Sequence, residues 1–375
     1  MDSLDSIAER ILSWYAKNKR DLPWRDTANP YFIWVSEIML QQTQVETVIP
    51  FYQHFLSTFP TVESLAEASL QEVLKAWENM GYYARARHLH AAAKEIAGRM
   101  GGKIPNTYEE LMGLPGIGSY TASAILSFAF GERRPAVDGN TRRVVCRLFA
   151  VQDLVEQPGT KQKILELARD MISSVDPAEF NHAVMDLGAM VCTPRNPSCV
   201  VCPVQDVCLA FEQGIQEALP VTRKKGPVPH KHMTAAVITD AKGQLLIVQR
   251  PNSGLLGGLW KFPGGFTGPE ETLEVGLIKR MREELGIRVE VQEALASVEH
   301  AYTHFRITLQ AFRCKRRSGK PKALDCQAYQ WVRPNYLVDY PFSKADRKII
   351  ARLRISQGDL FGQRPDHGRT HGEHK

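Results

Sequence analysis

The stretch LMGLPGIGSYTASAILSFAFG, residues 111–131, decides the fold of the N-terminal part of this chain. It predicts two helices joined by a tight turn at Pro115, Gly116 and Gly118, because proline fixes one backbone angle and glycine tolerates left-handed conformations. The second helix would begin with backbone N–H groups that have no partner within the helix. Such a helix start binds anions, and on DNA the anion is a phosphate. Taken alone, the stretch fits an ordinary helix–helix connection equally well.

Charge is divided unevenly along the 375 residues. Residues 1–218 hold 20 basic and 26 acidic side chains, net −6, so the overall +6 leaves a net +12 for residues 219–375. The length and the two unlike halves predict two domains. With 43% apolar residues each half can bury its own core, which excludes disordered and fibrous classes.

The periodicity of apolar residues changes near the middle of the chain. It is helical up to about residue 215, and residues 219–232 are rich in proline and basic residues, as in an extended linker. Beyond the linker we expect two hairpins, TAAVITD with QLLIVQR and LASVEHAYTH with FRITLQAFRC, and helices at 271–285 and 343–355. The predicted organisation is an all-α domain (1–218), the linker (219–232), an α+β domain (233–356) and a disordered tail (357–375).

Neither a membrane span nor a secretion signal is evident. The longest nearly uninterrupted apolar stretch, Ala124–Phe130, is far shorter than the roughly 20 residues that a spanning helix needs. The N-terminus carries early acidic residues and has no apolar signal core. We therefore expect an intracellular protein.

Four of the seven cysteines fall within 17 residues, at Cys192, Cys199, Cys202 and Cys208. Prolines between them favour an irregular loop in which four thiolates can converge on one centre. An intracellular location disfavours disulfides, so metal binding is the better interpretation. The spacing alone does not separate zinc from an iron–sulfur cluster.

A family resemblance rests on several motifs together. The LPGIG hairpin, VDGNTRRV (137–144) and the four-cysteine loop resemble the helix–hairpin–helix DNA glycosylases of the endonuclease III superfamily. Within that superfamily, LPWR, WVSEIMLQQTQVETVIPFY, GYYARARHLH and NHAVMDLGAMVC resemble the MutY adenine DNA glycosylases over residues 10–210. The resemblance implies that the four cysteines hold a [4Fe–4S] cluster. It also implies base excision of adenine mispaired with 8-oxoguanine or guanine in duplex DNA.

Two carboxylates are the candidate catalytic groups, because N-glycosidic hydrolysis needs an acid for the leaving base and an anion for the cationic sugar. Glu37 lies in the apolar stretch FIWVSEIML, where desolvation would raise its pKa. The resemblance makes Glu37 the general acid, and makes Asp138, with Asn140 beside it, the group that stabilises the sugar. Alone, Glu37 would be interpreted as a carboxylate near a helix start and Asp138 as a helix N-cap.

Tyr120 predicts that the enzyme does not cut the strand. Lyase members of the superfamily carry a lysine two residues after the second hairpin glycine, where Tyr120 stands, and no lysine occurs between Lys103 and Lys161. We therefore expect a monofunctional glycosylase that leaves an abasic site.

The resemblance also implies residues that contact DNA or the flipped adenine. His182 occupies a position where relatives carry Gln or Glu, and on its own it would be interpreted as a structural histidine. The full set expected to bind substrate is Trp24, Arg25, Leu40, Gln42, Val45, Tyr82, Leu114, Gly116, Gly118, His182, Tyr302, Thr303 and His304.

The C-terminal segment GGFTGPEETLEVGLIKRMREELGI resembles a Nudix box. Lys279 and Arg280 stand where that box has Arg and a metal-binding Glu, and a cation at a ligand position repels metal. We therefore expect the fold without the hydrolase activity. Within the domain, Tyr302-Thr303-His304 replaces the aromatic–Ser–His segment with which the MutY family recognises 8-oxoguanine, and Thr303 keeps the hydroxyl. A plain strand is the alternative interpretation.

Basic side chains of the second half are expected to neutralise phosphates, at Arg223, Lys224, Lys225, Lys315, Arg316, Arg317, Lys320 and Lys322. Gln357–Phe361 resembles the pentapeptide by which bacterial repair proteins dock on the sliding clamp, although an ordinary helix end fits as well. The resemblance implies a monomeric, cytoplasmic, nucleoid-associated protein of bacterial type. An endonuclease III-like pyrimidine glycosylase and a non-catalytic iron–sulfur protein are the alternatives; Tyr120 disfavours the first, and Glu37 with Asp138 the second.

Overall fold

The computed structural model describes residues 4–172, 175–223, 226–268 and 270–356. Lys224, Lys225 and the predicted clamp-binding segment Gln357–Phe361 lie outside these ranges. The chain divides into two compact units, Met1–Glu67 with His88–Lys225, and Ala68–Arg87 with Gly226–Lys375. Among the described residues, no helix is long and apolar enough to cross a membrane.

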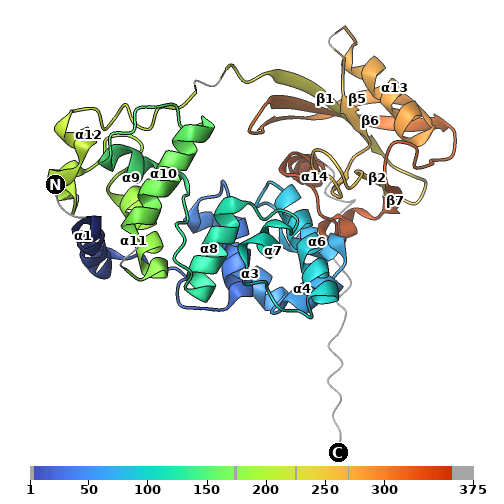
Figure 1. The fold of residues 1–375 in the computed structure, drawn as a ribbon. Helices are drawn as coiled ribbons and strands as arrows, with labels where there is room; N and C mark the ends of the chain where they lie inside the picture. Colours follow the sequence, from blue (N-terminus) through green and yellow to red (C-terminus); the bar gives the residue numbers. More distant parts are fainter. Residues whose placement is uncertain (1–3, 173–174, 224–225, 269, 357–375) are drawn as a thin grey trace, which may run out of the picture. The chain divides into compact units, whose positions relative to one another are not determined.

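In the described residues of the first unit the regular elements are helices, as the periodicity predicts (Figure 1). Its α-helices are α1 (Leu4–Asn18), α2 (Pro30–Leu40), α3 (Val45–Thr58), α4 (Val62–Glu67), α7 (Tyr108–Met112), α8 (Ser119–Phe130), α9 (Gly139–Leu148), α10 (Pro158–Met171), α11 (Pro177–Met190) and α12 (Leu209–Glu212). Helix α6 (Ala84–Arg99) is divided: residues 84–87 belong to the second unit and the rest to the first. Two short 3-10 helices, η1 (Cys199–Val201) and η2 (Gln205–Val207), lie in the cysteine loop.

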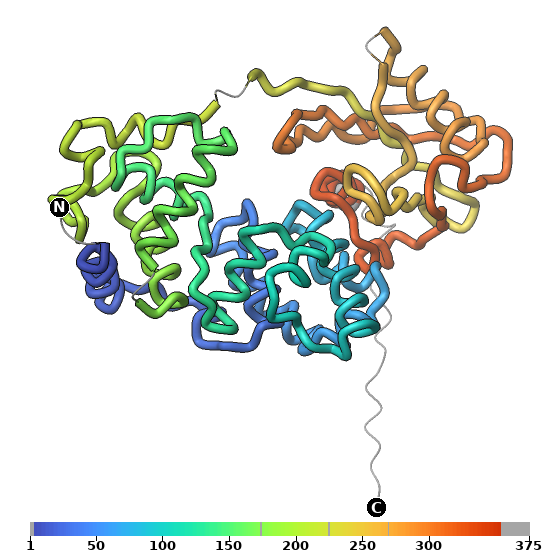
Figure 2. Tube along the Cα trace, in the orientation of Figure 1, coloured from blue at the N-terminus to red at the C-terminus, as the bar shows by residue number. Residues whose placement is uncertain are grey.

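One core of this unit joins the N-terminal helix to the cysteine loop. Ile7 and Ile11 of α1 pack with Val144 of α9 and Leu187 of α11, and Cys192 borders the same cluster. In Figure 2 the tube of α1 accordingly runs beside that of α11. The apolar stripes of three helices far apart in sequence therefore fix the position of the cysteine loop.

Besides the start of α6, the described residues of the second unit form two sheets and three α-helices. Its helices are α5 (Leu70–Ala76), α13 (Leu273–Leu285) and α14 (Lys344–Ser356), with the 3-10 helix η3 (Pro334–Asp339). The strands are β1 (His230–Ile238), β2 (Leu245–Gln249), β3 (Trp260–Lys261), β4 (Gly264–Phe266), β5 (Arg288–Ala301), β6 (Arg306–Ser318) and β7 (Ala328–Val332). One sheet has the order β4-β1-β6-β5 and the other β3-β2-β7.

From Met233 to Ile238, strand β1 is buried on both faces, because helices cover the two sides of its sheet. Ala235 and Val237 face the cluster that includes α14, whereas Ala236 and Ile238 face the cluster that includes α13. Figure 1 shows α13 lying along this sheet. The α-and-β architecture predicted for the C-terminal domain is confirmed.

The first of the two predicted hairpins is wrong. A turn does join β1 to β2, with Asp240 N donating to Gln244 O at 2.9 Å, but only the isolated bridge Thr239–Leu245 follows it. The strands then diverge, β1 pairing with β4 and β6, and β2 with β3 and β7. Continuous apolar strands carry no alternation that identifies their partners. The second hairpin, β5 with β6, is confirmed.

Candidate active site

A cavity of about 690 Å³ lies in the first unit, between α2, the α7–α8 hairpin, α9 and α11. It gathers most of the residues singled out from the sequence. Those that line it are Trp24, Arg25, Glu37, Leu40, Gln42, Val45, Gly116, Gly118, Tyr120, Asp138, Asn140 and His182. Segments separated by well over 100 residues therefore supply one pocket.

Glu37 is almost wholly buried, with 4% of its surface exposed. The hydroxyl of Tyr120 donates to Glu37 Oε2 at 2.7 Å. Burial raises the pKa of Glu37 to about 7, because the charged form loses its hydration; nearby Asp138 raises it further, while the Tyr120 hydrogen bond opposes the shift. At neutral pH this carboxyl therefore holds a proton in a large fraction of molecules.

Asp138 is the N-cap of α9, as the alternative interpretation had it, and it also lines the cavity. Its Oδ1 accepts from Thr141 N at 2.7 Å, and its Oδ2 accepts from Asn140 Nδ2 at 3.0 Å. These bonds fix the carboxylate at the cavity wall. Asp138 therefore acts both as the N-cap of α9 and as part of the cavity wall.

Arg143 was missed by the sequence reasoning, although it follows Asn140 by three residues and so shares its helix face. Its Nη2 donates to Asn140 Oδ1 at 2.9 Å and to Gly188 O at 2.7 Å, and its Nε donates to Cys192 O at 2.6 Å. A Cβ on Gly188 would stand 2.7 Å from Asn140 Cβ, so α11 approaches α9 this closely only because residue 188 is glycine. The guanidinium connects the cavity wall with the cysteine loop.

His182 is stacked on Phe128, with ring centroids 4.2 Å apart. Burial lowers the pKa of His182 to about 3, and the charge of Arg25 lowers it too, so the ring is neutral. Arg25 makes a two-pronged ion pair with Asp186, with both N–O distances 2.7 Å. Trp24 packs edge-on against Tyr52 at 5.5 Å. Arg20 pairs with the same Asp186 carboxylate at 2.6 Å, so this part of the wall combines aromatic rings with a charged Arg20–Asp186–Arg25 cluster.

The hairpin turn needs glycine at position 116. Gly116 has φ +79°, and a Cβ there would stand 2.6 Å from His88 Cβ. Gly118 is the N-cap residue of α8, and it has no side chain to cap the first N–H groups of that helix. Leu114 is buried beneath the turn and its carbonyl accepts from Ile117 N. The local geometry leaves these N–H groups available to an anion.

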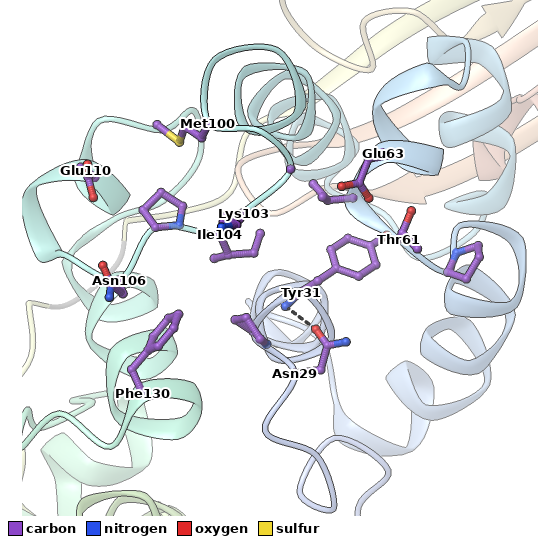
Figure 3. Close-up of a pocket in the computed structure, with 15 residues that line it drawn as sticks. Asn29, Tyr31, Thr61, Glu63, Met100, Lys103, Ile104, Asn106, Glu110 and Phe130 are labelled. Atoms are coloured by element: carbon purple, nitrogen blue, oxygen red, sulfur yellow. Dashed lines mark hydrogen bonds between the residues drawn. The ribbon is translucent and has the colours of Figure 1, made fainter.

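A second cavity, shown in Figure 3, shares no residue with the first. It lies at the start of α2, near Asn29 and Tyr31, whereas Glu37 belongs to the other half of that helix. The catalytic candidates are all absent from its lining.

The four loop cysteines lie close enough for each to affect another electrostatically. Burial raises the pKa of Cys202 to about 12, and charges on Cys192, Cys208 and Cys199 would raise it further. Arg147 Nη1 donates to Cys192 Sγ at 3.3 Å. In the described ranges, no three His, Cys, Asp or Glu side chains are grouped so as to hold a single metal ion, a narrower condition than sharing a multi-iron cluster.

Comparisons with known proteins agree with this arrangement. Residues 35–170 match the HhH-GPD superfamily of base excision DNA repair proteins, and residues 192–208 match the iron–sulfur binding domain of endonuclease III. The human adenine DNA glycosylase is 34% identical, over 94% of this chain and 74% of its own length. This chain belongs to the adenine DNA glycosylase family. The adenine DNA glycosylase of Buchnera aphidicola (subsp. Schizaphis graminum) is 32% identical, over 80% of this chain and 85% of its own length.

A solved structure is similar to part of the chain. A thermostable thymine-DNA glycosylase superposes with a TM-score of 0.52 and 29% identity, covering 56% of this chain and 97% of that one. Residues 234–352 match the NUDIX domain. The family assignment thus accounts for the helical unit, the cysteine loop and the C-terminal domain.

Within this family context, the cysteine loop fits a [4Fe–4S] cluster. Four thiols share one loop, which packs on the α1–α11 core, and Arg147 offers a positive hydrogen-bond donor to one of them. Four thiolates are the usual ligand set of such a cluster, and a cation beside them offsets their charge. The alternative of zinc, open from the spacing alone, is disfavoured by the match to an iron–sulfur domain.

The second unit holds the remaining predicted residues. Tyr302 N donates to Phe305 O at 2.8 Å, which closes the β5–β6 turn and leaves Thr303 and His304 exposed. Tyr82, in the part of the chain that packs in this unit, shares a hydrogen bond of 2.8 Å between its hydroxyl and Thr303 Oγ1. The structure thus brings together two residues that are 221 positions apart.

The Nudix-like segment uses its carboxylates in ion pairs. Lys279 pairs with Glu271 at 3.1 Å, Arg280 with Glu283 at 3.0 Å, and buried Lys261 with Glu284 at 2.7 Å. Side-chain cations thus stand beside the acidic groups that a divalent metal would need.

Proposed function

We propose that this protein excises adenine paired with 8-oxoguanine or guanine in duplex DNA, and that it leaves an abasic site without cutting the strand. The observation that carries the proposal is the unequal environment of two carboxylates in one cavity. Glu37 is buried with its pKa raised to about 7, whereas Asp138 accepts two hydrogen bonds. One group is suited to give a proton, and the other to face a developing positive charge.

In the proposed reaction, protonated Glu37 gives its proton to a ring nitrogen of adenine, so that the base leaves as a neutral molecule. The carboxylate of Asp138 stabilises the cationic sugar, and Asn140 holds that carboxylate in place. The bond between the base and the sugar breaks, water adds to the sugar carbon, and the proton that this water loses restores Glu37 to its acidic form. Tyr120 occupies the position of the lyase lysine, and a phenol forms no Schiff base.

Reaching adenine requires flipping it out of the duplex. We assign Gln42 and Tyr82 to probing the lesion side of the mismatch, and the hairpin turn at Gly116–Gly118 to a backbone phosphate. Thr303 would read the altered edge of 8-oxoguanine, flanked by Tyr302 and His304. The ion pairs of Lys279 and Arg280 support a reading domain without hydrolase activity.

We propose that the cluster has a structural role. Held by Cys192, Cys199, Cys202 and Cys208, a [4Fe–4S] group supplies redox chemistry when bound, and the proposed reaction needs none. Arg143 and Arg147 hold the loop to α9 through Cys192 O and Thr193 O. A monomer suffices, because one chain provides every proposed role.

The test is single-turnover incubation with a duplex that contains one 8-oxoguanine:adenine pair, followed by alkali. We expect alkali-dependent cleavage at the adenine, a loss of about 10²–10⁴-fold in Glu37→Gln, and little change in Glu166→Gln, an exposed residue of α10. No alkali-labile site with the unaltered enzyme would refute the adenine assignment. Cleavage without alkali at the rate of base loss would refute the monofunctional assignment.

A further inference from the structure

The segment between α5 and α6 has an unusual backbone. Asn79, Gly81 and Tyr82 adopt φ values of +76°, +82° and +48°. Glycine and asparagine tolerate such angles, but a bulky tyrosine rarely adopts them, so neighbouring contacts must hold Tyr82 in this conformation. Tyr82 is nevertheless 42% exposed.

Arg85 provides those contacts. It is only 9% exposed, and its guanidinium carbon lies 5.4 Å from the ring centroid of Trp77 and 5.1 Å from that of Tyr82. Its Nη2 donates to Gly81 O at 3.3 Å, and Trp77 Nε1 donates to the same carbonyl at 3.0 Å. Burial lowers the pKa of Arg85 to about 10, so the group stays charged at neutral pH.

The exposed ring is therefore held at two places. The cation contacts the ring, and the hydroxyl at the far end is bonded to Thr303. We propose that Arg85 is a positioning residue, which orients the Tyr82 ring before DNA arrives so that it can enter the base stack opposite the flipped adenine. This inference rests on the proposed function. An oriented ring loses less conformational freedom on binding than a rotating one, so affinity rises without a new contact to DNA.

The chemistry of arginine suits this position. A planar guanidinium can stack on two aromatic rings and also donate to a carbonyl, whereas a lysine ammonium is a compact charge that cannot stack. Arg85→Lys keeps the charge and Arg85→Met keeps much of the apolar bulk. Arg99→Lys is the matched control, because Arg99 lies on the same helix and is exposed.

The first test measures the protein in the absence of DNA. The protein is labelled with 3-fluorotyrosine, and the ¹⁹F signal of Tyr82 is identified by its loss in Tyr82→Phe. We expect one well-dispersed signal in the unaltered protein and in Arg99→Lys, and a signal shifted towards that of a freely rotating tyrosine in Arg85→Met and Arg85→Lys. An unchanged Tyr82 signal in folded Arg85→Met would overturn the proposal, whether or not the proposed function is right.

The second test is a double-mutant cycle on binding to a duplex with 8-oxoguanine opposite a non-cleavable adenine analogue. We expect Arg85→Met to weaken binding about tenfold, the size of one cation–π contact, and Arg99→Lys to change it less than about twofold. In a Tyr82→Ala background, Arg85→Met should have no further effect. Equal losses in both backgrounds would mean that Arg85 acts independently of Tyr82. Should Arg85→Met not fold, Arg85→Lys completes the same cycle.

Discussion

The hydroxyl of Tyr120 donates to Glu37 Oε2 at 2.7 Å, inside the cavity that also holds Asp138. This bond connects the hairpin helix α8 to α2, and it acts on the acidity of the carboxyl. Burial raises the pKa of Glu37, while the bond lowers it because it stabilises the ionised form. Through this bond, a residue of the hairpin helix lowers the pKa of the carboxyl proposed to protonate adenine.

Replacing Tyr120 with Phe should move the pH dependence of base removal. Glu37 acts in its protonated form, so the single-turnover rate should fall as pH rises through about 7 in the unaltered enzyme. Without the hydroxyl, the pKa of Glu37 should be higher, and the falling limb should move to higher pH. Rates measured from pH 5.5 to 9 check this. A limb that stays in place, or moves to lower pH, would contradict the role assigned to the bond.

Glu37 should also destabilise the fold at high pH. Its pKa is raised from 4.5 to about 7, so the folded protein binds more protons than the unfolded chain between these values. The free energy of unfolding should therefore fall as pH rises through this window, by roughly 3 kcal/mol at most. Glu37→Gln should remove that loss, and should raise the melting temperature more at pH 8 than at pH 4.5. Equal shifts at both pH values would count against the raised pKa.

Gly116→Ala should weaken both the fold and DNA binding. The left-handed φ of +79° and the 2.6 Å approach of a Cβ to His88 Cβ both oppose a side chain. We expect a loss of more than about 1 kcal/mol in urea denaturation and weaker binding to duplexes of any sequence. Gly98→Ala is the matched control, because Gly98 lies within α6 with open space around its Cα. Gly98→Ala should stabilise the protein by up to about 1 kcal/mol. If the Gly116→Ala protein were as stable as this control, a side chain at position 116 would cause no backbone strain and the prediction would be wrong.

Thr303→Ala should reduce selectivity more than turnover. The hydroxyl of Thr303 is exposed at the β5–β6 turn, bonded to Tyr82, and can donate to and accept from a modified base edge. We expect the preference for 8-oxoguanine:adenine over guanine:adenine to fall, by about tenfold for the loss of one base contact. Thr303→Ser, which keeps the hydroxyl, should retain the preference. Equal losses on both duplexes in Thr303→Ala would argue against a reading role.

Local signals in the sequence predicted much of this fold. The hairpin at Gly116 and Gly118, the four-cysteine spacing and the change of period after residue 219 each depend on a few adjacent residues. The pairing of β1 could not be predicted this way, because an apolar strand buried on both faces fits more than one partner. The contacts of the arginines beside the site could not be predicted either, since their partners, such as Cys192 O for Arg143, lie far away in sequence.

By itself, the sequence determined the identity and spacing of the reacting groups: Glu37 in an apolar helix, Asp138 at a helix start and tyrosine in place of lysine at position 120. Only the tertiary structure decided what those groups can do. A pKa depends on burial and on neighbours, and the neighbours of Glu37 come from residues 83 and 101 positions onward. Likewise, Tyr82 and Thr303 meet only because residues 68–87 pack within the C-terminal unit. Short-range conformational preferences form the helices and strands, whereas desolvation and long-range contacts set the pKa values and hydrogen bonds of the side chains on them.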